Sequence, residues 1–272
     1  MDIRNIVLSL DPLVDPLPLL GHAMDVAQAF GAKLNVSTAA RPWMEPVGAD
    51  IGPAAISLFD EQRAQIEVAI GNLESVFSST VPSAMRGKFR GLIEEPTEQL
   101  IESAALADLI VVGARSVSTA DPQIHVDAGK VVLSAGRPVM LVAEAAPISF
   151  DSIVVAWKDT REARRAVADA LPMLALAKQV LVASVDEDDY AAEREGIKDV
   201  VTWLDGHGIA ARSDVLPRNG SVVETLAVAA QAVNAGLIVS GGYGHTRLRE
   251  WLFGGATYDL LRLLTVHRLL SN

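Results

Sequence analysis

Short apolar segments alternate with amphipathic helical patterns along the chain, and the alternation occurs twice with nearly the same spacing. Ile6 and Leu34, in the first and second apolar segments, are 28 residues apart (34 − 6), while Ile153 and Val180 are 27 apart (180 − 153). Buried strands that alternate with helices are typical of parallel sheets. The matched spacing predicts an internal duplication, with one α/β domain in residues 1–147 and a second in residues 148–272.

The composition allows two folded domains and excludes several classes of protein. Half of the 272 residues are hydrophobic and 21% are charged, which is enough apolar surface for sizeable cores. The net charge of −11 argues against nucleic acid and anionic membranes as partners. The absence of cysteine excludes disulfides and thiol chemistry, and it fits a reducing compartment. No apolar run approaches the roughly 20 residues of a membrane span, so we expect a cytoplasmic protein.

The apolar periodicity predicts the elements of both halves. Strands are expected at residues 5–10, 34–38, 88–92, 109–113, 138–142, 153–157, 180–185, 212–216 and 237–240, with a last one from 266, and helices at 19–30, 54–77, 96–107, 163–174, 196–207 and 222–233. Asp159 and Glu162 resemble a capping box at the start of one helix, and Pro172 predicts a bend within it.

A glycine-rich stretch follows the apolar segment 237–240. Gly241 and Gly244 come directly after it, and Gly254 and Gly255 precede a leucine-rich helical pattern that begins near Thr257. Glycines at the start of a helix leave backbone N–H groups open to solvent, which is the arrangement that binds phosphate. The alternative is that these glycines only form tight turns.

The spacing Gly241-x2-Gly244-x9-Gly254 resembles the nucleotide-binding signature of the universal stress protein family, Gly-x2-Gly-x9-Gly-(Ser/Thr). Residues 153–160 resemble the opening strand and turn of the family, as do residues 6–11, and residues 138–142 resemble its closing strand. The resemblance covers essentially the whole chain. It implies two tandem Rossmann-like domains, each an open, five-stranded parallel sheet with helices on both faces. It also implies a nucleotide, usually ATP, at the carboxyl ends of the strands.

The resemblance also implies which residues would contact the nucleotide. Phosphate and ribose contacts would fall on Gly241, Gly244, Gly254, Gly255 and Thr257, and adenine-side contacts on Ala156 and Trp157 and near Ser184 and Val185. AMP or ADP could replace ATP, and Mg²⁺ would accompany only a bound nucleotide.

Both halves depart from the family pattern. Gly255 stands where the family has Ser or Thr, and Lys158 stands where it commonly has an Asp that accepts a hydrogen bond from the nucleotide. An ammonium has no acceptor, so Lys158 would either pair with a phosphate or point to solvent. The N-terminal half keeps the Asp, as Asp11, but residues 113–116 lack the second glycine and Asp127 precedes Gly129. We therefore expect the C-terminal half to bind and the N-terminal half to be mainly structural.

No other residues suggest catalysis or metal binding. His22, His207 and His267 are scattered, with no partner spacing for catalysis, and His125 with Asp127 is too small a set for a metal site. Trp157 could stack on a base or pack in the core.

The chain is thus expected to be an adenine-nucleotide-binding module in stress response, not an enzyme. A slow ATP hydrolase that uses the same pocket and a nucleotide-free scaffold are the alternatives. The closing strands at 139–142 and 266–270 could pair antiparallel and make a pseudo-dimer of the two halves. A homodimer of the whole chain is also compatible with the sequence.

Overall fold

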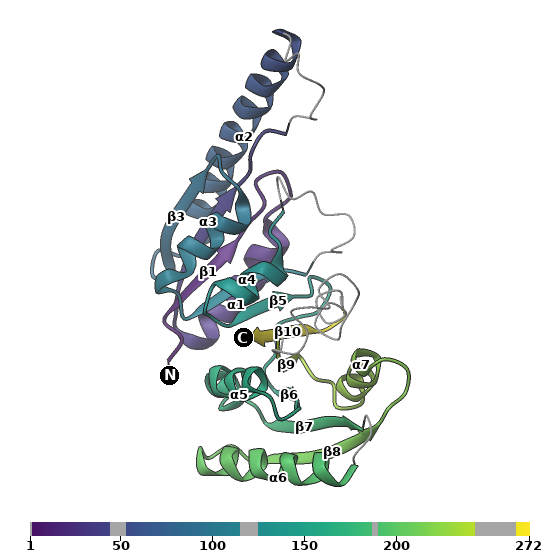
Figure 1. The fold of residues 1–272 in the computed structure, drawn as a ribbon. Coiled ribbons are helices and arrows are strands. Elements are labelled where there is room, and N and C mark those ends of the chain that lie inside the picture. Colours follow the sequence, from purple (N-terminus) through teal and green to yellow (C-terminus); the bar gives the residue numbers. More distant parts are fainter. Residues whose placement is uncertain (1, 44–52, 115–124, 187–189, 243–264) are drawn as a thin grey trace.

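The computed structural model describes residues 2–43, 53–114, 125–186, 190–242 and 265–272. Within these residues ten strands form one sheet in the order β3-β2-β1-β4-β5-β10-β9-β6-β7-β8 (Figure 1). The mostly parallel α/β architecture that the sequence indicates is confirmed. The strands are β1 (Asn5–Ser9), β2 (Lys33–Ala39), β3 (Arg86–Leu92), β4 (Leu109–Gly113), β5 (Val139–Val142), β6 (Ser152–Ala156), β7 (Gln179–Asp186), β8 (Ala211–Pro217), β9 (Leu237–Gly241) and β10 (His267–Ser271).

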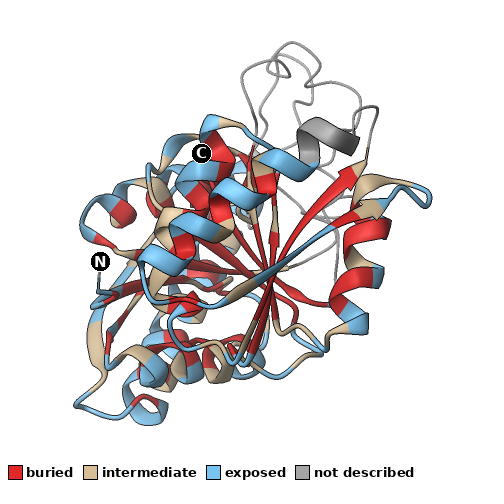
Figure 2. Cartoon of the chain, turned by 90° about the horizontal axis from the view of Figure 1, so that it is seen from below, coloured by how far each residue is buried: buried red, intermediate tan, exposed pale blue. Residues whose placement is uncertain are grey.

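Helices cover both faces of the sheet. They are α1 (Leu17–Phe30), α2 (Pro53–Thr80), α3 (Pro96–Ser103), α4 (Ala128–Ser134), α5 (Arg161–Leu174), α6 (Tyr190–Gly206) and α7 (Val222–Ala232), with a short 3₁₀ turn, η1 (Ala104–Leu106), after α3. Apolar side chains of α1, α2, α5 and α6 pack on one face, and those of α3, α4 and α7 pack on the other. Figure 2 shows the buried residues along the strands and on the inner sides of the helices. Among the described residues, no helix has the length and apolar content needed to cross a membrane.

The spacing of the sequence repeat corresponds to strand register. Ile6 lies beside Leu34 in the parallel pair β1–β2, and Ile153 lies beside Val180 in the parallel pair β6–β7. All four side chains are almost fully buried. The residues that align the two halves in sequence therefore occupy equivalent places in the sheet.

The strands that close the two halves lie side by side at the centre of the sheet. Strand β10 pairs antiparallel with β5, with Arg268 beside Leu141, Leu269 beside Met140 and Leu270 beside Val139. Its other edge pairs parallel with β9. Each strand thus covers an edge that the other half would otherwise leave without hydrogen-bond partners.

Helix α5 starts one residue later than the sequence suggests. Its N-cap is Thr160, whose Oγ1 accepts a hydrogen bond from the backbone N–H of Ala163 at 3.2 Å. Asp159 instead pairs with Arg164. The expected capping box of Asp159 and Glu162 is therefore wrong, because Glu162 is the second and not the third residue of the helix. Pro172 does lie inside α5, as expected.

Candidate functional site

The strand order places a topological switch point between β6 and β9. From β6 the chain continues through β7 and β8 on one side, and then returns to form β9 and β10 on the other. Ala156, at the carboxyl end of β6, lies beside Ser240 near the carboxyl end of β9. Open α/β sheets bind their ligands in the crevice at such a point. The corresponding point of the first half lies between β1 and β4, where Leu8 is beside Val111.

Those of the sequence-predicted residues that the structure describes lie at this end of the sheet, but they are divided between its two faces. Ala156 and Val185 pack with the layer of α7. Trp157 packs with the layer of α5 and α6, and a Cβ atom on Gly241 would point into the start of α5. Lys158 is exposed directly after Trp157. Gly244, Gly254, Gly255 and Thr257 lie outside the described residues.

Trp157 has the core-packing role that was one of its two alternatives. Its side chain belongs to the main apolar cluster, and the residue is 9% exposed. Its backbone N–H donates to the carbonyl of Ala183 at 2.8 Å, while the indole Nε1 is buried without a hydrogen-bond partner in the described part of the chain. Helix α6 lies against that nitrogen at Gly196, where a Cβ atom would be 3.7 Å from it. Stacking on a base would require the ring to leave this packing.

The two glycines at the end of β9 have structural reasons of their own. A Cβ atom on Gly241 would lie 2.6 Å from the backbone nitrogen of Ala163 and 2.7 Å from the carbonyl carbon of Glu162. On Gly242, the same atom would lie 2.8 Å from Cγ1 of Val132, a residue of α4 in the first half. The backbone N–H of Gly242 donates to the carbonyl of Ser271 at 2.8 Å. Close approach of β9 to α5 and α4 therefore requires glycine at both positions.

The charged groups beside this turn include a buried carboxylate. Glu162, 2% exposed, is the acidic residue that a side chain at Gly241 would meet, and it pairs with the guanidinium of Arg161 at 3.1 Å. Lys158 adds an exposed ammonium at the carboxyl end of β6. An ammonium and the backbone N–H groups of a glycine turn can together hold an anionic group.

The equivalent position of the first half is arranged differently. Asp11 accepts a hydrogen bond from the backbone N–H of Leu13 at 2.9 Å through Oδ1, and its Oδ2 lies 2.7 Å from Nδ1 of His125. Asp127 caps α4 by accepting from the backbone N–H of Lys130 at 3.0 Å. Both carboxylates are thus engaged by groups of the same chain. Among the described residues, no cluster of three or more His, Cys, Asp or Glu could hold a metal ion.

Two of the histidines that are scattered in sequence meet in space. The rings of His22, on α1, and His267, on β10, are 6.0 Å apart and roughly perpendicular. Burial lowers the pKa of His267, and the neighbouring basic side chains of His22 and Arg268 lower it further, while the hydrogen bond to the Pro147 carbonyl opposes these effects. The sequence gives no local signal for this pair, because its members belong to different halves.

Arg268 is a second feature that sequence reasoning missed. It is fully buried, and its Nη1 donates to the carbonyl of Val266 at 2.8 Å. Burial lowers its pKa to about 10, because the charged form loses its hydration. A cation therefore lies at the centre of the sheet, within the strand where the two halves meet.

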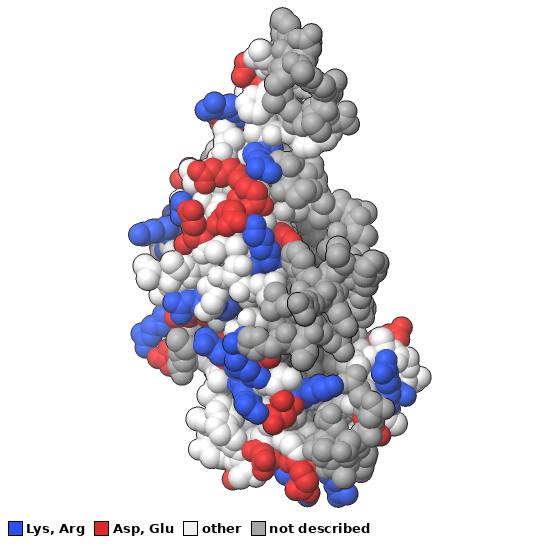
Figure 3. Space-filling view, in the orientation of Figure 1, with Lys and Arg blue, Asp and Glu red and all other residues white. Residues whose placement is uncertain are grey.

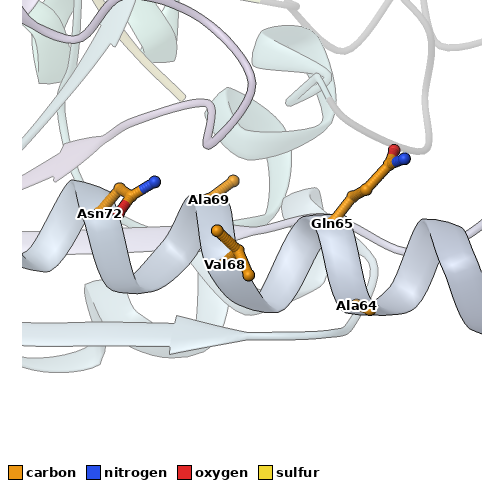
Figure 4. Close-up of a pocket in the computed structure, with 5 residues that line it drawn as sticks. All are labelled: Ala64, Gln65, Val68, Ala69 and Asn72. Atoms are coloured by element: carbon orange, nitrogen blue, oxygen red, sulfur yellow. The ribbon is translucent and has the colours of Figure 1, made fainter.

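Among the described residues, few surface side chains outside the strand ends converge on a possible ligand. Carboxylates gather over α3 in Figure 3, but Glu98 pairs with Lys130 and Glu102 with Arg90. A hollow along α2 is lined by Ala64, Gln65, Val68, Ala69 and Asn72, whose side chains are drawn in Figure 4. All of its lining comes from one helix, whereas ligand pockets have polar groups that converge from several elements.

No family model and no curated protein matches the sequence, whereas solved structures match its fold. A universal stress protein from Archaeoglobus fulgidus DSM 4304 superposes with a TM-score of 0.73 at 15% identity, covering 100% of this chain and 99% of that one. A functionally unknown protein from Pseudomonas aeruginosa PAO1 gives 0.60 at 18% identity, covering 99% and 92%. A putative universal stress protein from Pseudomonas aeruginosa UCBPP-PA14 gives 0.60 at 19%, covering 99% and 93%. The chain therefore has the fold of universal stress protein structures along its full length.

Proposed function

We propose that this chain is a tandem universal stress protein whose C-terminal half, residues 148–272, binds an adenine nucleotide. The observation that carries the proposal is the position of Ala156, Lys158 and Gly241 at the switch point between β6 and β9. The pattern Gly241-x2-Gly244-x9-Gly254 continues from that point, although most of it lies outside the described residues. A role in stress tolerance is part of the same proposal, because it rests on the same family assignment.

The nucleotide would contact few side chains in this half. Ala156 and Val185 would bound the adenine, and Lys158 would pair with a phosphate that the glycine backbone also holds. Gly244, Gly254, Gly255 and Thr257 would supply the remaining contacts. ATP is the proposed ligand, with AMP and ADP as variants, and Mg²⁺ would enter only with the phosphates.

The N-terminal half, residues 1–147, would serve as a structural partner. The pairing of Asp11 with His125 supports this, because it engages the carboxylate that the family uses for the nucleotide. The antiparallel pairing of β5 with β10 supports an intrachain pseudo-dimer of the two halves. Dimers of the whole chain are a further proposal, tested by its mass in solution.

We assign no enzymatic activity to the pocket. Glu162, the carboxylate beside Gly241, is buried and paired with Arg161. A slow ATP hydrolase would need an acidic residue that reaches Mg²⁺ and a positioned water. Turnover that is present in the purified protein and lost in Gly244→Asp would establish the hydrolase instead.

A nucleotide-free scaffold is the second candidate function. One observation favours it: packing against Ala163 and Val132 accounts for Gly241 and Gly242 without a ligand. Under this alternative the glycine pattern would persist for the fold alone.

The deciding experiment is to identify any ligand that the protein carries. The full chain is purified at low salt without added nucleotide and denatured, and the released molecules are identified by chromatography and mass spectrometry. About one adenine nucleotide per chain is expected. Two per chain would overturn the assignment of the N-terminal half. No release, followed by no binding when ATP is titrated in a calorimeter, would overturn the proposal in favour of the scaffold.

A further inference from the structure

The segment that connects the two halves is held by histidine side chains from both of them. His267, at the start of β10, accepts a hydrogen bond at Nδ1 from the backbone N–H of Ala143 at 3.1 Å, and its Nε2 lies 3.1 Å from the carbonyl of Pro147. His22, from α1, places its Nε2 3.0 Å from the carbonyl of Glu144. Residues 143–147, directly after β5, are thus bonded to one side chain of each half.

These contacts define the protonation state of His267. A backbone N–H can only donate, so Nδ1 must be the unprotonated acceptor, while a carbonyl can only accept, so Nε2 must carry the hydrogen. The ring is therefore the neutral Nε2–H tautomer, with both nitrogens satisfied and 1% of the residue exposed. A proton on Nδ1 would place two N–H groups face to face at Ala143. His22 differs, because its Nε2–H can donate to Glu144 whether the ring is neutral or charged.

The charges near His267 do not favour a second proton. His22 and Arg268 are the groups whose charge acts on it, and both are basic. Helix α5 contacts β10 and carries two acidic residues, Glu162 and Asp169. Each is paired with an arginine of the same helix, Glu162 with Arg161 and Asp169 with Arg165. The carboxylate of Glu144 lies toward Gly113, where a Cβ atom would be 3.3 Å from its Oε1.

We propose that His22, His267 and residues 143–147 form a pH-sensitive clasp between the two halves, closed while His267 is neutral and opened when its Nδ1 takes up a proton from solvent. Opening breaks the bond to Ala143 and exposes the charged ring to water. Ala143 follows the last residue of β5, and His267 is the first residue of β10, so the same event loosens this end of the β5–β10 pair. Acidification is thereby coupled to the junction between the halves, independently of any nucleotide.

The test combines ring titration with amide exchange on the whole chain. Long-range proton–nitrogen NMR correlations report the tautomer and charge of each of the five histidine rings. The His267 ring is identified as the signal that is missing in His267→Gln. This ring should stay in the neutral Nε2–H tautomer below pH 6.5. The protection of the Ala143 amide against hydrogen exchange, corrected for intrinsic rates, should fall as pH is lowered from 7.5 to 5. The fall should reach up to about tenfold per pH unit once His267 is the titrating group.

Matched variants separate the clasp from general acid loosening. His207→Gln, directly after the end of α6 at Gly206, removes a histidine outside the clasp and should leave the Ala143 profile unchanged. The amide of Trp157, which is bonded to the carbonyl of Ala183, should keep a flat profile in the wild-type protein. In His267→Gln the Ala143 profile should become flat. A His267 ring that titrates at 6.5 or above would overturn the proposal. Ala143 protection that is independent of pH in the wild-type protein would also overturn it, even if His267→Gln fails to fold.

Discussion

The backbone nitrogen of Ala163 lies 2.6 Å from the place that a Cβ atom on Gly241 would occupy. Because the obstacle is backbone at the start of α5, no side-chain rotation can relieve the overlap. We expect Gly241→Ala to lower the free energy of unfolding by about 1–3 kcal/mol, measured by urea denaturation.

Gly21 provides the matched control for that substitution. It lies within α1 with no atom in the way of an added Cβ. Gly21→Ala should therefore raise the free energy of unfolding by about 0.5–1 kcal/mol, because alanine favours the helix more than glycine does. If Gly241→Ala does not lower the free energy of unfolding, as Gly21→Ala is not expected to, the packing of β9 against α5 described above is wrong.

The cap of α5 can be assigned by two substitutions at neighbouring residues. Thr160→Ala removes the acceptor of the Ala163 amide and should cost about 1 kcal/mol of unfolding free energy. Asp159→Ala removes an exposed pair with Arg164 and should change it by less than about 0.5 kcal/mol. Thermal and urea unfolding of both variants would check this, and the reverse order would restore Asp159 as the cap.

The stability of the chain should depend on pH through His267. Its pKa is lowered in the folded state from the usual 6.5, so the unfolded chain binds the proton more readily. The contribution of His267 is complete above pH 6.5 and is lost as pH falls below that value towards the folded-state pKa. Urea unfolding at pH 7.5 and 5.5 should show a smaller decrease for His267→Gln than for the wild type. Equal decreases would mean that other groups carry the pH dependence.

Gly244→Asp should abolish nucleotide binding while the fold remains intact, because a carboxylate in the glycine turn would repel phosphate. Calorimetric titration with ATP and far-UV circular dichroism would check the two parts. Asp11→Asn is the control in the other half and should leave the stoichiometry unchanged, since Asp11 is already paired with His125. If Gly244→Asp binds ATP with the affinity of the wild-type protein, the glycine pattern is not part of the binding site.

The positions of the strands along the chain could be predicted because the signal is local. Runs such as 109–113 are apolar on both faces, and the structure has β4 at those residues. The helix starts were less predictable. Helix α1 begins at Leu17, two residues before the start expected at residue 19, with Pro18 in its first turn. Proline is tolerated there because no helical N–H bond is needed at that position.

The contacts at the site depended on tertiary structure that no local pattern records. Glycine at 241 suggested phosphate binding, whereas the structure adds a packing reason that only the approach of α5 makes visible. The pairing of His22 with His267 spans 245 positions (267 − 22) and follows from the central place of β10. The pairing of Asp11 with His125 likewise joins residues that follow two different strands.

The pairing of β5 with β10 has an evolutionary consequence. Two separate copies of one half would have to share every substitution, since each would be translated from the same gene. Joined in one chain, the halves meet in fixed proportion and each can change alone. One half can thus carry His125 opposite Asp11 while the other carries Gly241 and Lys158 at its strand ends. Strands β5 and β10 pair at the centre of the sheet and hold the halves together, so residues at the strand ends of each half are free to change independently.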